Sequence, residues 1–279
     1  MVAPRIDAHQ HFWRYSPQTH PWIDDSMLAI KRDFLPPDLK PLLGAAGFDG
    51  CIAVQAEQSV AETGWLLGLA DAYPFIRGVV GWVDLCAPDV AEQLRSVAAH
   101  PRLRGIRHIV QDEPEGFVLR PDFQRGIAAL AEFGLAYDIL IYERQLPEAL
   151  ELVRRFPAQR FAIDHIAKPA IRDGSIDAWR IGIKAIAAEA NVYCKLSGMV
   201  TEADWQRWRP ADFAPYIETV LDAFGPTRVM IGSDWPVSLL AAEHGNVISI
   251  VTDAIGPLRV EDREAIMGGT AAAFYGVAT

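Results

Sequence analysis

Apolar segments typical of strands alternate with helical segments along almost the whole chain, and this repeat limits the folds that the chain can adopt. Each strand-like run is followed by residues with helical spacing, and the runs recur at intervals of roughly 25 to 45 residues. The predicted strands lie at 5–13, 49–55, 76–85, 103–110, 135–142, 160–165, 192–197 and 228–234. The predicted helices lie at 36–46, 60–73, 88–99, 121–133, 147–156, 176–190, 212–224, 245–255 and 260–275.

Eight strand–helix units are the number in a closed (β/α)8 TIM barrel, an α/β fold. The strands are continuous apolar runs, as expected of a parallel sheet that is buried on both faces. A doubly wound sheet is the alternative, but it usually carries a glycine-rich turn after its first strand, which is missing here. We therefore expect one barrel domain over residues 1–279, in which the irregular segment 15–34 forms a long loop that covers a site.

The composition excludes several classes of partner. The net charge is −10 and no basic cluster is present, so neither a nucleic acid nor a membrane surface is expected to bind; a small neutral substrate fits better. No signal-peptide pattern and no run of about 18 apolar residues is present, which predicts a cytoplasmic protein. The three cysteines are widely spaced in or beside apolar runs, and we interpret them as reduced core residues. We expect a monomer or a homodimer.

In barrels of this kind the active site lies at the carboxyl ends of the strands, so the polar residues there are candidates. Each of them also has an ordinary structural explanation, such as packing for Trp82, helix capping for Glu57 and Asp84, ion pairing for Arg107 and an outward position for Lys195. The full set of candidates is His9, His11, Gln55, Glu57, Trp82, Asp84, Arg107, His108, Asp138, His165, Lys195, Ser197 and Asp234.

Four of these candidates, His9, His11, His165 and Asp234, belong to strands that a closed barrel brings together. Alternation along the first strand would point Asp7, His9 and His11 to one side. Imidazoles are common zinc ligands and also carry protons near neutral pH, so the group suits a metal site or proton transfer. Strand eight is the neighbour of strand one in a closed barrel, which predicts that these groups meet.

Three motifs resemble those of the amidohydrolase superfamily, specifically its sugar lactonase branch. They are Asp7-Ala8-His9-Gln10-His11, Asp164-His165-Ile166-Ala167-Lys168-Pro169 and Gly232-Ser233-Asp234-Trp235-Pro236. Within that branch, segments 54–56, 62–67 and 105–108 look like those of L-fuconolactonase and L-rhamnonolactonase. The resemblance covers the whole chain and implies a metal-dependent-hydrolase type of barrel that hydrolyses a sugar lactone to the open aldonic acid.

The chain departs from the dinuclear members of the superfamily. Those proteins place a bridging Lys or Glu on strand four and a further His on strand five, where this chain has Arg107-His108 and Asp138. The resemblance therefore implies at most one divalent ion, most simply zinc, held by His9, His11, His165 and Asp234. Turnover need not depend on that ion, because some lactonases of this branch are regarded as working without one.

Lactone hydrolysis needs an activated water, a stabilised oxyanion and a proton for the departing ring oxygen. We expect Asp234 to be the general base. The three histidines would polarise the carbonyl as protonated donors or through an ion that acts as a Lewis acid, and one of them would return the proton. For sugar recognition we expect planar polar groups and aromatic faces, supplied by Gln55, His108, Asp138, Trp82, Trp22 and Arg107.

Two other functions fit the sequence. A metal-dependent decarboxylase of an aromatic acid resembles the same branch, and Arg107 would bind its carboxylate. A barrel that binds a sugar or a metal without catalysis belongs to another class, and the convergence of histidines with an aspartate argues against it. A panel of aldonolactones, followed by acid release, separates the three.

Overall fold

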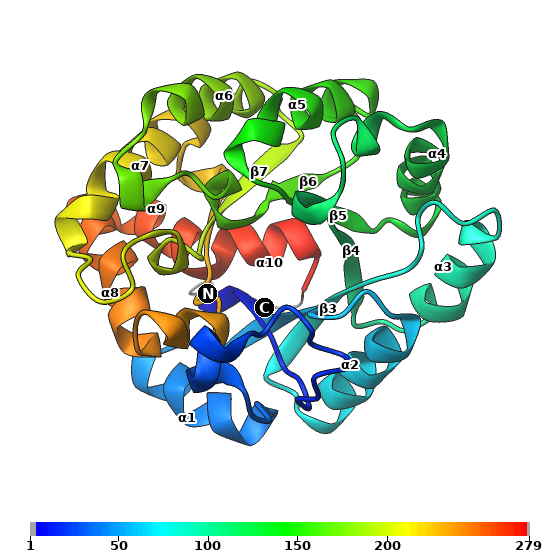
Figure 1. Ribbon diagram of the computed structural model, residues 1–279, viewed down its shortest axis with the longest axis horizontal. Coiled ribbons are helices and arrows are strands. Elements are labelled where there is room, and N and C mark those ends of the chain that lie inside the picture. The colour runs from blue at the N-terminus through cyan, green and yellow to red at the C-terminus, as the bar shows by residue number, and fades with distance from the viewer. Residues whose placement is uncertain (1–3, 278–279) are drawn as a thin grey trace.

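The computed structural model describes residues 4–277, and its centre is an eight-stranded parallel sheet in the order β1 to β8. Each strand pairs with the next one along the chain, which is the arrangement of a (β/α)8 barrel (Figure 1). The strands are β1 Ile6–Gln10, β2 Gly50–Val54, β3 Ile76–Gly81, β4 Leu103–Ile109, β5 Ala136–Leu140, β6 Phe161–Ile163, β7 Val192–Leu196 and β8 Val229–Ile231.

Helices form a ring around these strands in Figure 1. They begin and end at residues that favour helix termini: Pro36 opens α1, and Gly47 closes it in the left-handed conformation. The helices are α1 Pro36–Ala46, α2 Val60–Ala72, α3 Val90–Ala98, α4 Pro121–Leu130, α5 Leu146–Arg155, α6 Asp177–Ala187, α7 Pro210–Phe224, α8 His244–Ile255, α9 Val260–Glu264 and α10 Thr270–Tyr275. The predicted barrel is confirmed.

The barrel closes between β1 and the residues that follow β8. The amide of Asp234 donates to the carbonyl oxygen of His9 at 2.8 Å, and the amide of His11 donates to the carbonyl oxygen of Trp235 at 2.7 Å. Gln10 and Trp235 form an isolated parallel bridge. The closure therefore places the two histidines of the first strand directly beside Asp234.

The first strand does not alternate regularly, so the predicted common side for Asp7, His9 and His11 is wrong. The register of β1 against β2 shifts between Asp7 and Gln10. The carboxylate of Asp7 bonds to Ser233 and lies 3.8 Å from Nε2 of His244 on α8, away from the two imidazoles. The bulge lets His9 turn inward while Asp7 fastens the strand.

The end of the chain closes the barrel at the opposite side from the site. The apolar side chains of α10, including Phe274 and Tyr275, pack with Ile6 and Ala8 of β1 in one buried cluster, and the helix crosses the middle of the ring in Figure 1. The predicted helix 260–275 is broken by a π-helical turn, Ala265–Gly269. A Cβ at Gly268 would lie 2.0 Å from the carbonyl oxygen of Pro4, so the N-terminal segment passes closely there.

The segment 15–34 is a long irregular connection with one 3-10 turn, Asp25–Ile30, as expected. Its ends are tied together, because the amide and carbonyl of Trp13 both bond to Phe34. Within residues 4–277, no helix combines the length and the apolar character needed to cross a membrane.

Candidate active site

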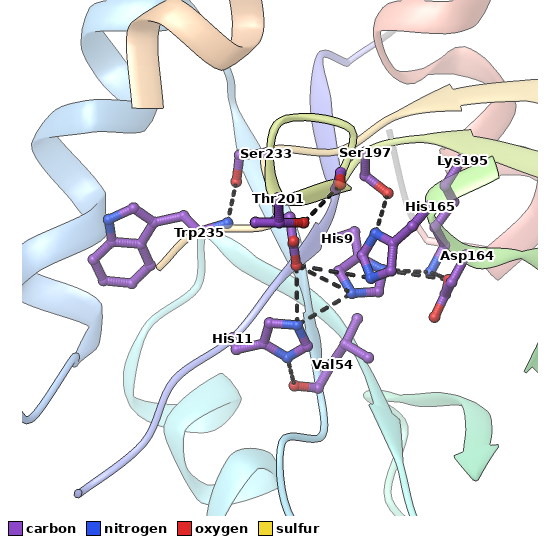
Figure 2. A network of polar contacts seen from close by, with 12 residues as sticks. His9, His11, Val54, Asp164, His165, Lys195, Ser197, Thr201, Ser233 and Trp235 are labelled. Atoms are coloured by element: carbon purple, nitrogen blue, oxygen red, sulfur yellow. Dashed lines mark hydrogen bonds and ion pairs between the residues drawn. The ribbon is translucent and has the colours of Figure 1, made fainter. Parts of the chain in front are cut away.

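The imidazoles of His9, His11 and His165 lie close together at the carboxyl ends of β1 and β6 (Figure 2). The carboxylate of Asp234, which follows β8, contacts all three. The Nε2 atoms of His9 and His11 lie 3.2 Å apart. Oδ1 of Asp234 lies 3.4 Å from Nε2 of His11, 3.8 Å from Nε2 of His165 and 3.9 Å from Nε2 of His9. The four groups that the sequence singled out therefore face one point.

In His11 and His165 the second ring nitrogen, Nδ1, forms a hydrogen bond with a neighbouring residue. Nδ1 of His11 lies 2.8 Å from the carbonyl oxygen of Val54, which can only accept, so Nδ1 carries the hydrogen. The Nε2 atom of His11 is then the ring nitrogen that faces the centre. Nδ1 of His165 lies 2.9 Å from the hydroxyl of Ser197, which can donate or accept. Such contacts orient imidazoles that bind a metal.

The loops that carry these groups adopt unusual backbone conformations. Residues 165–168 all have positive φ, from 45° to 62°, and Asp234 has φ 55°. Gly198 has φ 63°, and a Cβ there would lie 2.4 Å from Nδ1 of His165. Non-glycine residues rarely adopt this region, so the surrounding structure must enforce it where the loops turn into the site.

A buried network of charges lies beneath His9. The ammonium of Lys195 lies 2.5 Å from Oδ2 of Asp138, 2.9 Å from Oδ1 of Asp164 and 3.2 Å from Nδ1 of His9. The hydroxyl of Tyr275 on α10 donates to Asp138 at 2.7 Å. All these side chains are buried, so the opposite charges compensate one another where water cannot.

Arg107 joins this network to the site. Its Nε donates to Oε1 of Gln55 at 2.8 Å, its Nη2 donates to the backbone oxygen of Gln55, and its Nη1 donates to Oδ2 of Asp164 at 3.1 Å. Nη1 also lies 3.3 Å from Nε2 of His9. A guanidinium has five N–H groups, so Arg107 is fixed by three of them and keeps donors beside the cluster.

Burial controls the charge of two of the imidazoles. Desolvation lowers the pKa of His9 well below its usual value, although Asp164 opposes the shift. Desolvation also lowers the pKa of His165 well below its usual value. Both rings are therefore neutral near pH 7, and the expectation that they act as protonated donors does not fit their environment.

His9, His11 and Asp234 fit one divalent metal ion, and His165 lies beside them. A tetrahedral zinc site with bonds of about 2.0 to 2.1 Å separates its ligand atoms by ~3.3 Å, close to the distances within this cluster. His9, His11 and Asp234 form one grouping with metal-binding geometry, and His9, Asp164 and His165 form a second. The second grouping already contains a cation, because the ammonium of Lys195 contacts both His9 and Asp164. One ion is therefore the number that this site suits.

The cavity above this cluster encloses about 660 Å³, its open mouth included. Of the residues predicted to bind substrate, Trp22 and Arg107 line it. Its lining consists of His11, Trp13, Trp22, Ala56, Arg107, Ile109, Gln111, Asp112, Leu140, His165, Lys168, Thr201, Asp234 and Val237. The floor of the cavity is therefore polar, its walls combine polar and apolar side chains, and its size suits a small molecule.

The other predicted recognition residues lie behind this lining. Gln55 is fully buried and holds Arg107. Asp138 is fully buried beneath Lys195. Trp82 donates its indole N–H to Nδ1 of His108 at 3.3 Å, and His108 bonds to Glu113 and stacks on Phe117.

Sequence reasoning missed the supporting role of the buried charges and most of the residues that line the cavity. The sequence singles out Asp164 only as the neighbour of His165, and the outward position that is the ordinary explanation for Lys195 is wrong, because both side chains are fully buried at the site. Two buried opposite charges on neighbouring strands would have indicated a pair. Tyr275 gave no such indication, because it lies on the last helix, 137 residues from Asp138.

The sequence matches the model of one protein family, described as amidohydrolase, over residues 6–277. The chain belongs to the amidohydrolase family. This amidohydrolase is 45% identical to an L-fucono-1,5-lactonase of Burkholderia multivorans, across 99% of this chain and 97% of the relative. It is 39% identical to an L-fucono-1,5-lactonase of Burkholderia ambifaria, across 97% of this chain and 95% of the relative.

A crystal structure of an amidohydrolase from Burkholderia multivorans with bound zinc has the same fold. It superposes with a TM-score of 0.95 at 44% identity, and the match covers 99% of this amidohydrolase and 100% of the crystallised chain. The histidines and Asp234 described above give this amidohydrolase the residues to bind a divalent metal as well.

Proposed function

We propose that this amidohydrolase hydrolyses a sugar lactone to the open aldonic acid, and that L-fuconolactone is the substrate class to test first. The observation that carries the proposal is the meeting of Asp234 with three imidazoles on the floor of a small cavity. The relatives named as L-fucono-1,5-lactonases extend over nearly the whole chain and support the choice of substrate. Their match also supports a neutral sugar as the partner.

Asp234 is the general base in this proposal. Its carboxylate lines the cavity and lies within 3.4 to 3.9 Å of the three Nε2 atoms, so a water beside the cluster is within its reach. Asp234 takes one proton of that water, and the oxygen of the water forms a bond to the lactone carbonyl carbon. The carbonyl oxygen becomes an oxyanion, which needs donors around it.

Arg107 stabilises that oxyanion. Gln55 and Asp164 fix the guanidinium, and its Nη1 faces His9 at the floor of the cavity. A fixed donor aimed at the developing charge commonly contributes ~3 to 4 kcal/mol to transition-state stabilisation. When bound, a divalent ion, with zinc as our choice, would supply a Lewis acid at the same place.

The ring oxygen leaves when its bond to the carbonyl carbon breaks, and it then needs a proton. His9 and His165 are neutral because burial lowers their pKa values, so neither ring stores a spare proton. Asp234 carries the proton taken from water, and we assign it the return of that proton to the leaving oxygen. The carboxylate is then restored for the next turnover.

The decarboxylase alternative has less support. It required Arg107 to bind a substrate carboxylate, which is best done by two parallel N–H groups. Nε and Nη2 of Arg107 already donate to Gln55, and Nη1 donates to Asp164. The edge formed by Nε and Nη2 is therefore taken by Gln55, and a bidentate carboxylate could not use that edge.

The test is a panel of aldonolactones, with acid release followed by a pH indicator against an enzyme-free blank. We expect hydrolysis of L-fuconolactone at rates typical of enzymes, with kcat/KM of roughly 10⁴ M⁻¹s⁻¹ or more. Aromatic carboxylic acids, assayed for loss of carbon dioxide, test the alternative. Hydrolysis of no lactone in the panel above the blank would refute the proposal.

A further inference from the structure

The walls of the cavity differ in chemistry from strand to strand. Trp13 and Trp22, which follow β1, supply aromatic faces, and sugar rings commonly stack on such faces. Polar side chains follow β4, β6 and β7, and these are Gln111, Asp112, Lys168 and Thr201. A ring held over Asp234 would therefore meet an aromatic surface on one side and hydrogen-bonding groups on the other.

The cavity wall that carries these polar side chains also contains an apolar patch. Ile109 and Leu140 are directly paired across β4 and β5, at the carboxyl ends of both strands, and both line the cavity. Leu140 is buried and Ile109 is half-buried. Two aliphatic side chains side by side form a patch that has no hydrogen bond to offer, surrounded by groups that have.

Lys168 lies after β6, the strand next to this patch, and places a charged ammonium group beside the two apolar side chains. Its ammonium is 3.8 Å from Oε1 of Glu202, beyond hydrogen-bond distance, and lies over the ring of Tyr142 at 5.4 Å. The ammonium can therefore donate to a ligand hydroxyl without giving up a short hydrogen bond to Glu202. A ligand that satisfies both neighbours carries a hydroxyl for Lys168 and a hydrocarbon group for Ile109 and Leu140.

We infer that Ile109 and Leu140 form a subsite for the methyl group of a 6-deoxy sugar lactone and discriminate against lactones that carry a hydroxymethyl group there. The inference rests on the proposed lactonase function and adds the residues that read one end of the substrate. A hydroxyl pushed against these two side chains would lose its water partners and gain no protein partner. Apolar pockets of this kind discriminate by roughly 10- to 100-fold, so the effect is measurable.

L-Fuconolactone and L-galactonolactone make a matched pair of substrates, because they differ only in the hydroxyl on carbon 6. The measured quantity is the ratio of their kcat/KM values, which does not depend on the fraction of active enzyme. We expect the wild-type ratio to favour L-fuconolactone by about 10-fold or more. If no lactone of the panel is hydrolysed, the proposed function fails; if L-fuconolactone and L-galactonolactone are hydrolysed equally, this inference fails while the function stands.

Two variants test the assignment to these residues. Ile109→Thr adds a hydroxyl at a half-buried position, and Leu140→Asn keeps the side-chain shape while making it polar. We expect either change to lower the ratio by about 5-fold or more, mainly by improving hydrolysis of L-galactonolactone relative to L-fuconolactone. If Leu140→Asn fails to fold, Ile109→Thr decides alone. A ratio unchanged in the folded variants would overturn the inference.

Val237→Thr is the matched control, because Val237 lines the same cavity from the segment after β8. The substitution adds a hydroxyl of similar size to a different wall. We expect it to change kcat/KM for both lactones alike and to keep their ratio within about twofold. A fall in the ratio as large as that in Ile109→Thr would place the methyl group elsewhere and overturn the inference.

Discussion

The carboxylate of Asp7 accepts two hydrogen bonds from Ser233: Oδ1 accepts the backbone N–H at 2.9 Å, and Oδ2 accepts the side-chain hydroxyl at 2.6 Å. Asp7 lies on β1 and Ser233 directly precedes Asp234, so this contact joins the first strand to the residue beside the base. Both side chains are fully buried. The contact therefore fixes the distance between the two histidines of β1 and Asp234.

Ser233→Ala tests that role. The substitution removes the hydroxyl donor from a buried carboxylate, and a hydrogen bond to a charged group contributes about 1.5 to 3 kcal/mol. We expect the free energy of unfolding in urea to fall by about that amount and lactone turnover to fall roughly 10-fold as Asp234 loses its fixed position. Full turnover in a folded Ser233→Ala protein would show that the contact serves the fold alone.

Asp234→Asn tests the base directly. The amide keeps the shape of the side chain but cannot accept the proton of water, so kcat should fall by a factor of about 10³ or more. Circular dichroism and the KM for the lactone should change little. Hydrolysis within about threefold of the wild-type rate would transfer the role of base to another group.

Gly198→Ala tests the packing behind His165. The added Cβ would lie 2.4 Å from Nδ1 of His165, so the ring must move away from Ser197 and from Asp234. We expect kcat/KM to drop roughly 100-fold and binding of zinc, measured by titration, to weaken.

Gly134→Ala is the matched control, because Gly134 has the same φ of 63° with nothing within 4 Å of its Cβ position. It should cost about 1 kcal/mol of stability and leave the activity intact. Equal losses of activity in both variants would assign the effect to backbone strain.

Glu62 makes stability depend on pH. Its buried carboxyl accepts the backbone N–H groups of Ala56 and Glu57, yet desolvation raises its pKa from 4.5 to about 8. Between these values the folded protein binds more protons than the unfolded chain, so the free energy of unfolding falls as pH rises from about 4.5 to about 8. The loss should be on the order of a few kcal/mol and complete above pH 8.

Urea unfolding of the wild type and of Glu62→Gln at several pH values measures this dependence. The variant has no titratable group at residue 62, so its stability should change less across that range, whatever its absolute stability. Parallel curves for the two proteins would contradict the assignment.

Thiol labelling tests the placement of the cysteines. Cys51 and Cys194 are buried, and burial raises the pKa of the partly exposed Cys86 to about 11. At pH 8 only about one thiol in 10³ is ionised at Cys86, so its labelling should be slow and should accelerate about tenfold per pH unit. The other two should react only in denaturant. Rapid labelling of any cysteine at pH 8 in the folded protein would contradict this placement.

Local patterns in the sequence are enough to predict the barrel and the meeting of its catalytic candidates. Each strand is an apolar run with its own turn residues, and closure then brings His9, His11, His165 and Asp234 to one mouth. The bulge in β1 could not be predicted, because the side chain of Asp7 turns away from the imidazole of His9 to bond to Ser233, 226 residues later. The alternation of side chains along a strand carries no information about a partner so distant in the sequence.

The same limit applies to the buried charges and the cavity walls. Lys195 looks like a surface residue until Asp138 on β5 and Asp164, directly after β6, are placed around it. Gln55 and His108 lie at strand ends as expected, but one holds Arg107 and the other packs against Phe117. The positions of wall residues such as Lys168 depend on loop conformations with positive φ, for which the sequence of a non-glycine loop gives no indication.

The contact between Tyr275 and Asp138 has a consequence for the order in which the protein matures during synthesis. A ribosome makes β1 to β8 before it makes α10, so a nascent chain can hold every catalytic side chain while Asp138 still lacks its second donor. The interior cluster that α10 completes is also open at that stage. The hydrogen bonds of the charged network beneath His9 are therefore complete only when α10 docks.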